Sequence, residues 1–156
     1  MADMLVNLLK LQPVPFVPGI VIRRALPFEM TLTRQFIISN FGVGWTDEVS
    51  VAFSSRPSTL FIALDHIGRI CGFCAYECTA KAFLGPEGVS ESHRKRGIGK
   101  ALLLSALHGL RELGYAYGII GGVGPAEFYA KVAGATPIPD STPGIYANPI
   151  ANPIMS

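Results

Sequence analysis

Residues 88–100 read Gly-Val-Ser-Glu-Ser-His-Arg-Lys-Arg-Gly-Ile-Gly-Lys and join an apolar segment to the most regular helical pattern of the chain. The segment before this stretch, Phe83 to Val89, predicts a strand that is interrupted at Gly85-Pro86. The segment after it, Gly97 to Leu113, repeats apolar residues at the helical period and ends at Gly114. A strand therefore leads through a polar, basic loop into the start of an amphipathic helix.

The loop is suited to binding an anion at the helix start. The first backbone N–H groups of a helix have no partner, and the helix dipole adds partial positive charge there. Gly97 and Gly99 carry no Cβ, so a phosphate can approach the backbone closely. Arg94, Lys95 and Arg96 bring charge to the same place. This pattern favours a pyrophosphate.

Two better-known phosphate loops do not fit this stretch. A P-loop needs Ser or Thr after its Lys to hold magnesium, but Lys100 is followed by Ala101. The dinucleotide-binding pattern needs a third Gly at the position where Leu102 stands. The pattern that does fit is R-x-x-G-x-G between a strand and a helix.

This pattern, from Arg94 to Gly99, resembles the signature Q/R-x-x-G-x-G/A of the GCN5-related N-acetyltransferase (GNAT) family. The family's last motif is a short helix with Phe-Tyr and then Gly, and Phe128-Tyr129 and Gly134 match it at the usual distance. The resemblance covers residues 19–146 and is specific from Phe83 to Ala135.

The resemblance implies an α/β (α+β) fold, in which a mixed, mostly antiparallel sheet of about six to seven strands is flanked by about four helices. It also implies acetyl-CoA as co-substrate, no metal, and direct transfer of the acetyl group to a primary amine of a small molecule or peptide. We expect residues 19–150 to form a single GNAT domain, residues 1–18 an extended lead-in, and residues 151–156 a tail. Weak strand patterns at residues 136–139 and 144–146 would end the domain.

The resemblance assigns the coenzyme to the strand end and the loop. The backbone of Gly88 and Val89 would contact the thioester and the pantetheine arm, and Gly88 would suit a β-bulge. Phe128 of the Phe-Tyr motif would be a further contact. The pyrophosphate would lie on Arg94, Lys95, Arg96, Gly97, Ile98, Gly99 and Lys100.

Two residues are candidates for the chemistry. Tyr129 matches the family tyrosine that protonates the departing thiolate. Glu87 lies where some relatives place a carboxylate base, and burial would raise its pKa toward neutrality. A salt-bridged surface Glu87 and a water chain as base stay open. Without an unambiguous base, a non-catalytic acyl-CoA-binding or sensor module on the same fold is the alternative function.

The acceptor pocket is expected between the first two helices and the last strands. Phe41, Trp45 and Tyr146 are candidates for its walls, and packing in the core is the alternative for Phe41 and Trp45. The acidic residues that would attract an amine there are Asp47, Glu48 and Glu77.

One position departs from the family. Relatives often carry Asn six residues before the Phe of the Phe-Tyr pair, and here that position is Gly122. The coenzyme contact of that Asn would then be absent or made by the backbone, and the floor under the pantetheine arm would be flexible.

Composition limits the other classes of function. The 156 residues are 49% hydrophobic and 15% charged, which predicts one globular domain with a real core. A net charge of +2 is too small to indicate a nucleic-acid or membrane partner. No apolar run is long enough to span a bilayer, and the start lacks a basic signal region, so we expect a cytoplasmic protein.

The three cysteines, Cys71, Cys74 and Cys78, lie close together but have no second Cys or His pair to complete a zinc site. We interpret them as small buried hydrophobic residues. Related domains often pair, so a homodimer is possible.

Overall fold

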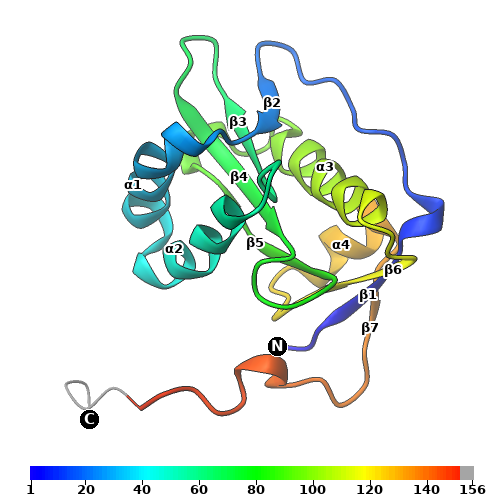
Figure 1. Ribbon diagram of the computed structural model, residues 1–156. Helices are drawn as coiled ribbons and strands as arrows, with labels where there is room; N and C mark the ends of the chain where they lie inside the picture. The colour runs from blue at the N-terminus through cyan, green and yellow to red at the C-terminus, as the bar shows by residue number, and fades with distance from the viewer. Residues whose placement is uncertain (152–156) are drawn as a thin grey trace.

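The computed structural model describes residues 1–151 as a seven-stranded sheet with helices on both faces (Figure 1). The strands are β1 (Met4–Asn7), β2 (Val21–Arg24), β3 (Leu60–Leu64), β4 (Ile70–Tyr76), β5 (Phe83–Val89), β6 (Tyr117–Ile120) and β7 (Thr136–Pro137). The α-helices of this part of the chain are α1 (Met30–Phe41), α2 (Val43–Ser50), α3 (Ile98–Glu112) and α4 (Ala126–Ala133). The expected fold, a mixed and mostly antiparallel sheet flanked by helices, is confirmed.

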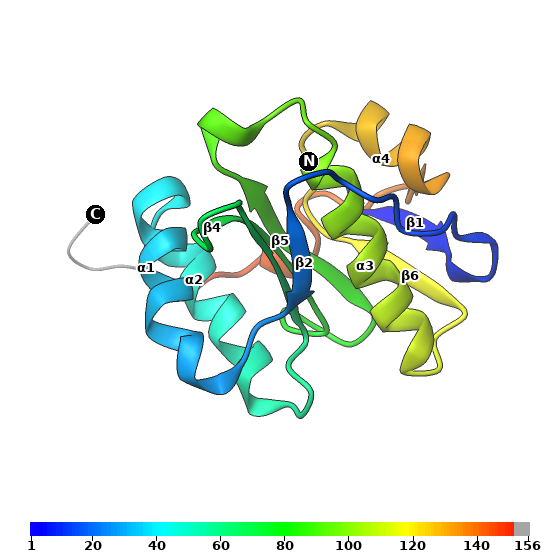
Figure 2. The ribbon, with the colours of Figure 1, turned by 90° about the horizontal axis from the view of Figure 1, so that it is seen from above.

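The sheet separates two apolar cores. Figure 2 shows α1 and α2 on one face of the sheet and α3 and α4 on the other. Ile37 and Val49 fill the core under α1 and α2, whereas Leu103 and Leu107 of α3 fill the other. The apolar pattern after Gly97 therefore predicted α3 correctly, although the helix is buried on more than one side, since the consecutive residues Leu103, Leu104 and Ser105 are all buried.

Strand order places one parallel contact at the centre of the sheet. The order is β2-β3-β4-β5-β6-β1-β7, and every neighbouring pair is antiparallel except β5 and β6. These two strands pair only at Phe83 with Ile119 and at Leu84 with Ile120, although β5 continues to Val89. Beyond Leu84, one edge of β5 therefore has no neighbouring strand on the β6 side.

The bulge in β5 lies earlier than expected. Gly88 pairs regularly with Phe73 of β4, so the prediction of a bulge at Gly88 is wrong. The register shifts between the pairs Cys74 with Glu87 and Tyr76 with Leu84, which puts the extra residue of β5 at Gly85-Pro86. Gly85 adopts a φ of 112°, which an L-residue rarely takes, and this explains the glycine at that position.

The N-terminal segment belongs to the sheet. Residues 1–18 were expected to be an extended lead-in, but β1 pairs antiparallel with β6 on one side and with β7 on the other. Its buried residues alternate with exposed ones, and Met4 and Val6 point into the core. The expectation fails because four residues are too short for a period-two pattern to stand out in the sequence.

The C-terminal segment only partly follows the expectation. Thr136–Pro137 forms β7, as the first weak pattern predicted. Gly144–Tyr146 is a 3-10 helix instead of a strand, because no neighbouring strand in the described residues offers it hydrogen bonds. Of the predicted tail, residues 152–156 lie outside the described residues.

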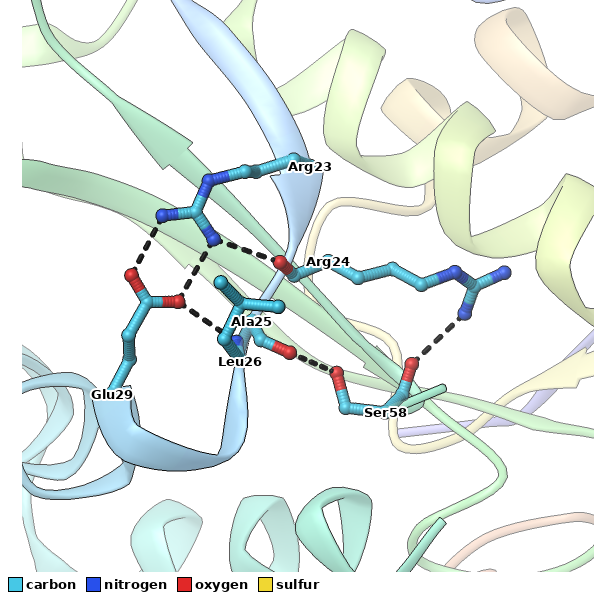
Figure 3. A network of polar contacts seen from close by, with 6 residues as sticks. All are labelled: Arg23, Arg24, Ala25, Leu26, Glu29 and Ser58. Atoms are coloured by element: carbon cyan, nitrogen blue, oxygen red, sulfur yellow. Dashed lines mark hydrogen bonds and ion pairs between the residues drawn. The ribbon is translucent and has the colours of Figure 1, made fainter. Parts of the chain in front are cut away.

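A network of hydrogen bonds and an ion pair links β2 to neighbouring segments of the chain (Figure 3). Arg23 donates two hydrogen bonds of 2.8 and 2.6 Å to the carboxylate of Glu29, whose Oε1 also accepts the Leu26 N–H at 2.8 Å. The hydrogen bond from Arg23 lowers the pKa of Glu29 below its ordinary value. Ser58 donates to the Ala25 carbonyl oxygen at 2.6 Å. The end of β2 is thus linked to the chain entering α1 and to the start of β3.

Further observations concern the membrane-spanning helices and the metal sites considered from the sequence. No helix among residues 1–151 combines the length and the apolar character needed to cross a membrane. Cys71 and Cys74 are buried and Cys78 is half-buried, all three as free thiols, in agreement with their interpretation as small apolar residues. Within residues 1–151, no cluster of His, Cys, Asp and Glu is arranged to hold a metal ion.

Candidate active site

A cavity of about 710 Å³ opens where β5 and β6 part. This volume lies within the range of small-molecule sites in proteins. Its walls are mostly apolar and come from β5, α2, α3, α4, the segment after β6 and the 3-10 helix near the C-terminus. The polar side chains among them are Glu48, Thr79, Glu87, Arg94, Tyr129 and Tyr146.

The basic loop borders this cavity at the start of α3. Gly97 caps the helix with a φ of 81°, and the first helical hydrogen bond runs from the Ala101 N–H to the Gly97 carbonyl oxygen at 3.2 Å. The N–H groups of Ile98, Gly99 and Lys100 donate to no acceptor within residues 1–151. The predicted anion site is therefore present as a set of unpaired donors.

The side chains of the loop differ in their placement. Arg94 and Gly99 line the cavity, and the Nε of Arg94 donates to the Val89 carbonyl oxygen at 3.2 Å. Ile98 is 1% exposed and packs in the core, so only its backbone N–H faces outward. A Cβ on Gly99 would lie 3.7 Å from Val89, which leaves the space above its backbone open. The side chains of Lys95 and Arg96 are exposed, and that of Lys100 is half-buried.

Glu87 and Tyr129 meet on the wall of the cavity. Glu87 projects from β5, and the hydroxyl of Tyr129 on α4 donates a hydrogen bond to its Oε1. Burial of the carboxyl raises the pKa of Glu87 to about 7, against the opposing effect of the hydrogen bond from Tyr129. Burial, followed by the neighbouring charge of Glu87, raises the pKa of Tyr129 above its ordinary value.

A carboxyl with a pKa near 7 that touches a phenol is equipped to move protons at neutral pH. Cys74, the cross-strand neighbour of Glu87, is fully buried, and burial raises the pKa of its thiol. Cys74 is therefore held as a neutral thiol beside the carboxyl. Phe128 also lines the cavity, and its ring packs edge-on against that of Tyr129 at 5.2 Å between centroids.

The aromatic residues expected in the acceptor pocket fall into two groups. Trp45 lines the cavity and is 38% exposed. Phe41 lies behind it, stacked on Trp45 with 5.3 Å between ring centroids, and its ring covers Gly88 so closely that a Cβ there would lie 2.5 Å away. Any side chain at position 88 would clash with the ring of Phe41, which explains the glycine there.

A second carboxylate stands on the α2 side of the cavity. The Oε2 of Glu48 accepts a hydrogen bond from the Thr79 hydroxyl and one of 3.0 Å from the Tyr146 hydroxyl. The predicted wall residue Tyr146 thus reaches the cavity from the 3-10 helix. The other two acidic candidates lie elsewhere: Asp47 is exposed, and Glu77 accepts hydrogen bonds from Tyr115.

Residues near the N-terminus form hydrogen bonds with the segment at Gly122. Asp3, which is 8% exposed, accepts the Gly122 N–H at 2.8 Å through Oδ1, and its own N–H donates to the Ser141 hydroxyl at 2.8 Å. Val123 donates to the Ala2 carbonyl oxygen at 3.0 Å. The Gly122 N–H is thus paired with Asp3, and the flexibility of the floor stays a prediction. The sequence has no local signal for Asp3, because its partners are more than a hundred residues away.

A protein-family model matches most of this chain. Residues 30–134 match the model of the acetyltransferase (GNAT) family. The chain belongs to the GNAT family. A search of curated proteins found no match to the chain.

Solved structures of other proteins share the GNAT fold of this chain. A GCN5-related N-acetyltransferase from Sphaerobacter thermophilus has a TM-score of 0.71 and 22% identity, over 88% of this chain and 48% of that one. The GNAT protein YhbS from Escherichia coli, solved with CoA, has a TM-score of 0.54 and 21% identity over 75% of this chain and 69% of that one.

A GNAT acetyltransferase from Brucella melitensis, solved with acetyl-CoA, has a TM-score of 0.53 and 20% identity over 76% of this chain and 86% of that one. The GNAT chain described here spans about half the length of the Sphaerobacter protein and about a fifth of a fungal multi-domain protein that contains a glucosamine N-acetyltransferase region.

Proposed function

We propose that this GNAT domain binds acetyl-CoA and transfers its acetyl group directly to a primary amine of a small molecule or peptide. The observation that carries the proposal is a single cavity that joins the unpaired N–H groups at the start of α3 to the hydrogen-bonded pair Glu87 and Tyr129. One part of the cavity is suited to a pyrophosphate, and the other to proton transfer.

The residues present fit the coenzyme. The N–H groups of Ile98, Gly99 and Lys100 would hold the pyrophosphate, with Arg94 beside it. The pantetheine arm would extend along the free edge of β5 at Gly88 and Val89. Bound there, acetyl-CoA supplies the acetyl thioester.

The chain's own groups would manage the protons. Glu87, with a pKa of about 7, is partly ionised at neutral pH and would take the proton that the attacking amine nitrogen loses. Tyr129 would donate its phenolic proton to the departing sulfur as the C–S bond breaks and the C–N bond forms. Glu87 would then return its proton to Tyr129 through the hydrogen bond between them. In net, one proton thus passes from the amine to the thiol, and both residues regain their starting state.

The test is calorimetric titration of acetyl-CoA, followed by assay of free thiol release with a panel of amines. Saturable binding and amine-dependent thiol release are expected. Binding without turnover on any amine would favour the non-catalytic acyl-CoA-binding or sensor module. A chain that binds no acetyl-CoA would contradict both functions.

A further inference from the structure

We propose that the acetyl acceptor is a primary amine that carries a second cationic group, and that Glu48 binds this second group on the α2 side of the cavity. This inference rests on the proposed acetyl transfer and names the substrate class of the same site. It starts from the two carboxylates that line one cavity, Glu48 and Glu87, which belong to separate hydrogen-bond networks.

Glu48 is oriented but not neutralised. Thr79 and Tyr146 both donate to its Oε2, and no group within residues 1–151 donates to Oε1. The ion pairs of the described residues join Arg23 to Glu29, Arg24 to Glu112 and His93 to Asp65, so none of them involves Glu48. A half-buried carboxylate with one free oxygen is a good acceptor for a charged donor, because a cation there restores the solvation that burial removed.

The surroundings of Glu48 also suit a cation. Trp45 and Tyr146 present aromatic surfaces to the cavity beside Glu48, and aromatic faces attract ammonium groups. The chain after β7 turns back beneath the N-terminus toward the side of α2, which brings Tyr146 to this wall (Figure 1). Phe73 and Phe83 add apolar lining to the same cavity, which suits the methylene chain of an aliphatic diamine.

The two carboxylates suit different parts of such an acceptor. Glu87 is bonded to Tyr129, so the reacting nitrogen belongs at that pair. Glu48 also accepts a hydrogen bond from a phenol, that of Tyr146, but only Glu87 lies on β5, along whose free edge the thioester would extend, so Glu48 supplies charge and orientation. An acceptor with its own carboxylate is disfavoured, because Glu48 would repel it.

Matched amines test the assignment. Putrescine and n-pentylamine have nearly equal lengths, but only putrescine carries a second ammonium group. We expect the kcat/KM of thiol release to be about 10- to 100-fold higher for putrescine, the range that one charge-assisted hydrogen bond provides. In Glu48→Gln this preference should fall to a few-fold, because KM for putrescine rises. Asp47→Asn, at an exposed position of the same helix outside the cavity lining, should behave as the wild type.

Binding provides a readout that does not need turnover. Trp45 is the only tryptophan of the chain and lines the cavity, so its fluorescence reports amine binding directly. Putrescine should shift this signal at lower concentrations than n-pentylamine, and Glu48→Gln should remove the difference. Equal binding and turnover of the two amines by the wild type would overturn the inference, as would an equal loss on both amines in Glu48→Gln. Failure of the proposed function is distinct: no thiol would be released with either amine, while the fluorescence titration still decides the role of Glu48.

Discussion

The two ends of the cavity are built in different ways. At the coenzyme end, the loop residues 94–97 and the first turn of α3 form one continuous stretch. At the acceptor end, Tyr146 and Glu48 are 98 residues apart. Asp3 and Gly122 are 119 residues apart, and they belong to this end because a Cβ at Gly122 would lie 3.9 Å from the Tyr146 ring. The coenzyme end depends on backbone groups that a local conformation aligns, whereas the acceptor end depends on side chains that only the completed sheet brings together. A change at the first should act on coenzyme affinity, and a change at the second on the amine.

The largest expected effect comes from charge at the coenzyme end. Gly99→Asp would place a carboxylate against the unpaired N–H groups, and acetyl-CoA affinity should fall about 100-fold or more in calorimetric titration. Gly99→Ala is the matched control, because a Cβ there meets only an ordinary contact of 3.7 Å, and its loss should be much smaller. An acidic residue in the first helical turn does not weaken the helix, so Tm should be retained. Unchanged affinity in Gly99→Asp would refute the anion site.

Tyr129→Phe separates the chemistry from coenzyme binding. The ring that packs on Phe128 stays, while the proton donor is lost, so kcat should fall about 100-fold with acetyl-CoA affinity within a few-fold of the wild type. Without the hydrogen bond that lowers it, the pKa of Glu87 should rise, and the rising limb of the pH–rate profile should move to higher pH. An equal loss of rate and affinity would instead indicate that Tyr129 only packs.

The pH dependence of Glu87 gives opposite signs for activity and stability. Activity should rise as pH passes through about 7, because the base must be ionised. The folded state binds the proton more tightly than the unfolded chain, so the free energy of unfolding should fall as pH rises from about 4.5 to about 7. Glu87→Gln should lose the activity and this part of the pH dependence, and at pH 8 it should be more stable than the wild type by as much as about 3 kcal/mol. Denaturant unfolding at several pH values measures the difference, and parallel curves for the two proteins would contradict it.

The smallest effect is expected at the N-terminal strand. Asp3→Ala would leave the Gly122 N–H without its acceptor and should cost about 1–3 kcal/mol in denaturant unfolding. KM for the amine should rise a few-fold, while acetyl-CoA affinity should change less, because Asp3 does not touch the loop 94–100. Asp3→Asn keeps an oxygen acceptor and is the matched control. A larger change in coenzyme affinity than in KM for the amine would break the division between the two ends.

Much of the fold could be predicted from local patterns. The strand–loop–helix from Phe83 to Glu112 and the short helix with Tyr129 appear near their expected places, because each has its own periodicity or end signal. β1 was missed because its partners β6 and β7 lie at the other end of the chain. The bulge position was missed because it depends on pairing with β4.

The candidate site was predictable to a similar extent. The coenzyme loop and Tyr129 carry motifs, and Glu87 follows from its place on β5. The packing of Phe41 behind Trp45 has no sequence signal, and neither has the hydrogen bond between Gly122 and Asp3. Glu48 was one of three acidic candidates, and only the contacts of Thr79 and Tyr146 distinguish it from Asp47 and Glu77. A cytoplasmic location and a homodimer stay predictions.

The sequence by itself determined the GNAT fold and an anion site at the start of α3, since a run of glycines and basic residues before an amphipathic helix acts through backbone groups within one turn. The tertiary structure alone decided what the rest of the cavity is. It raised the pKa of Glu87 by burying its carboxyl beside Tyr129, and it left one oxygen of Glu48 free among aromatic rings. Burial and long-range contacts produce both features, and neither is a property of any short stretch of the chain.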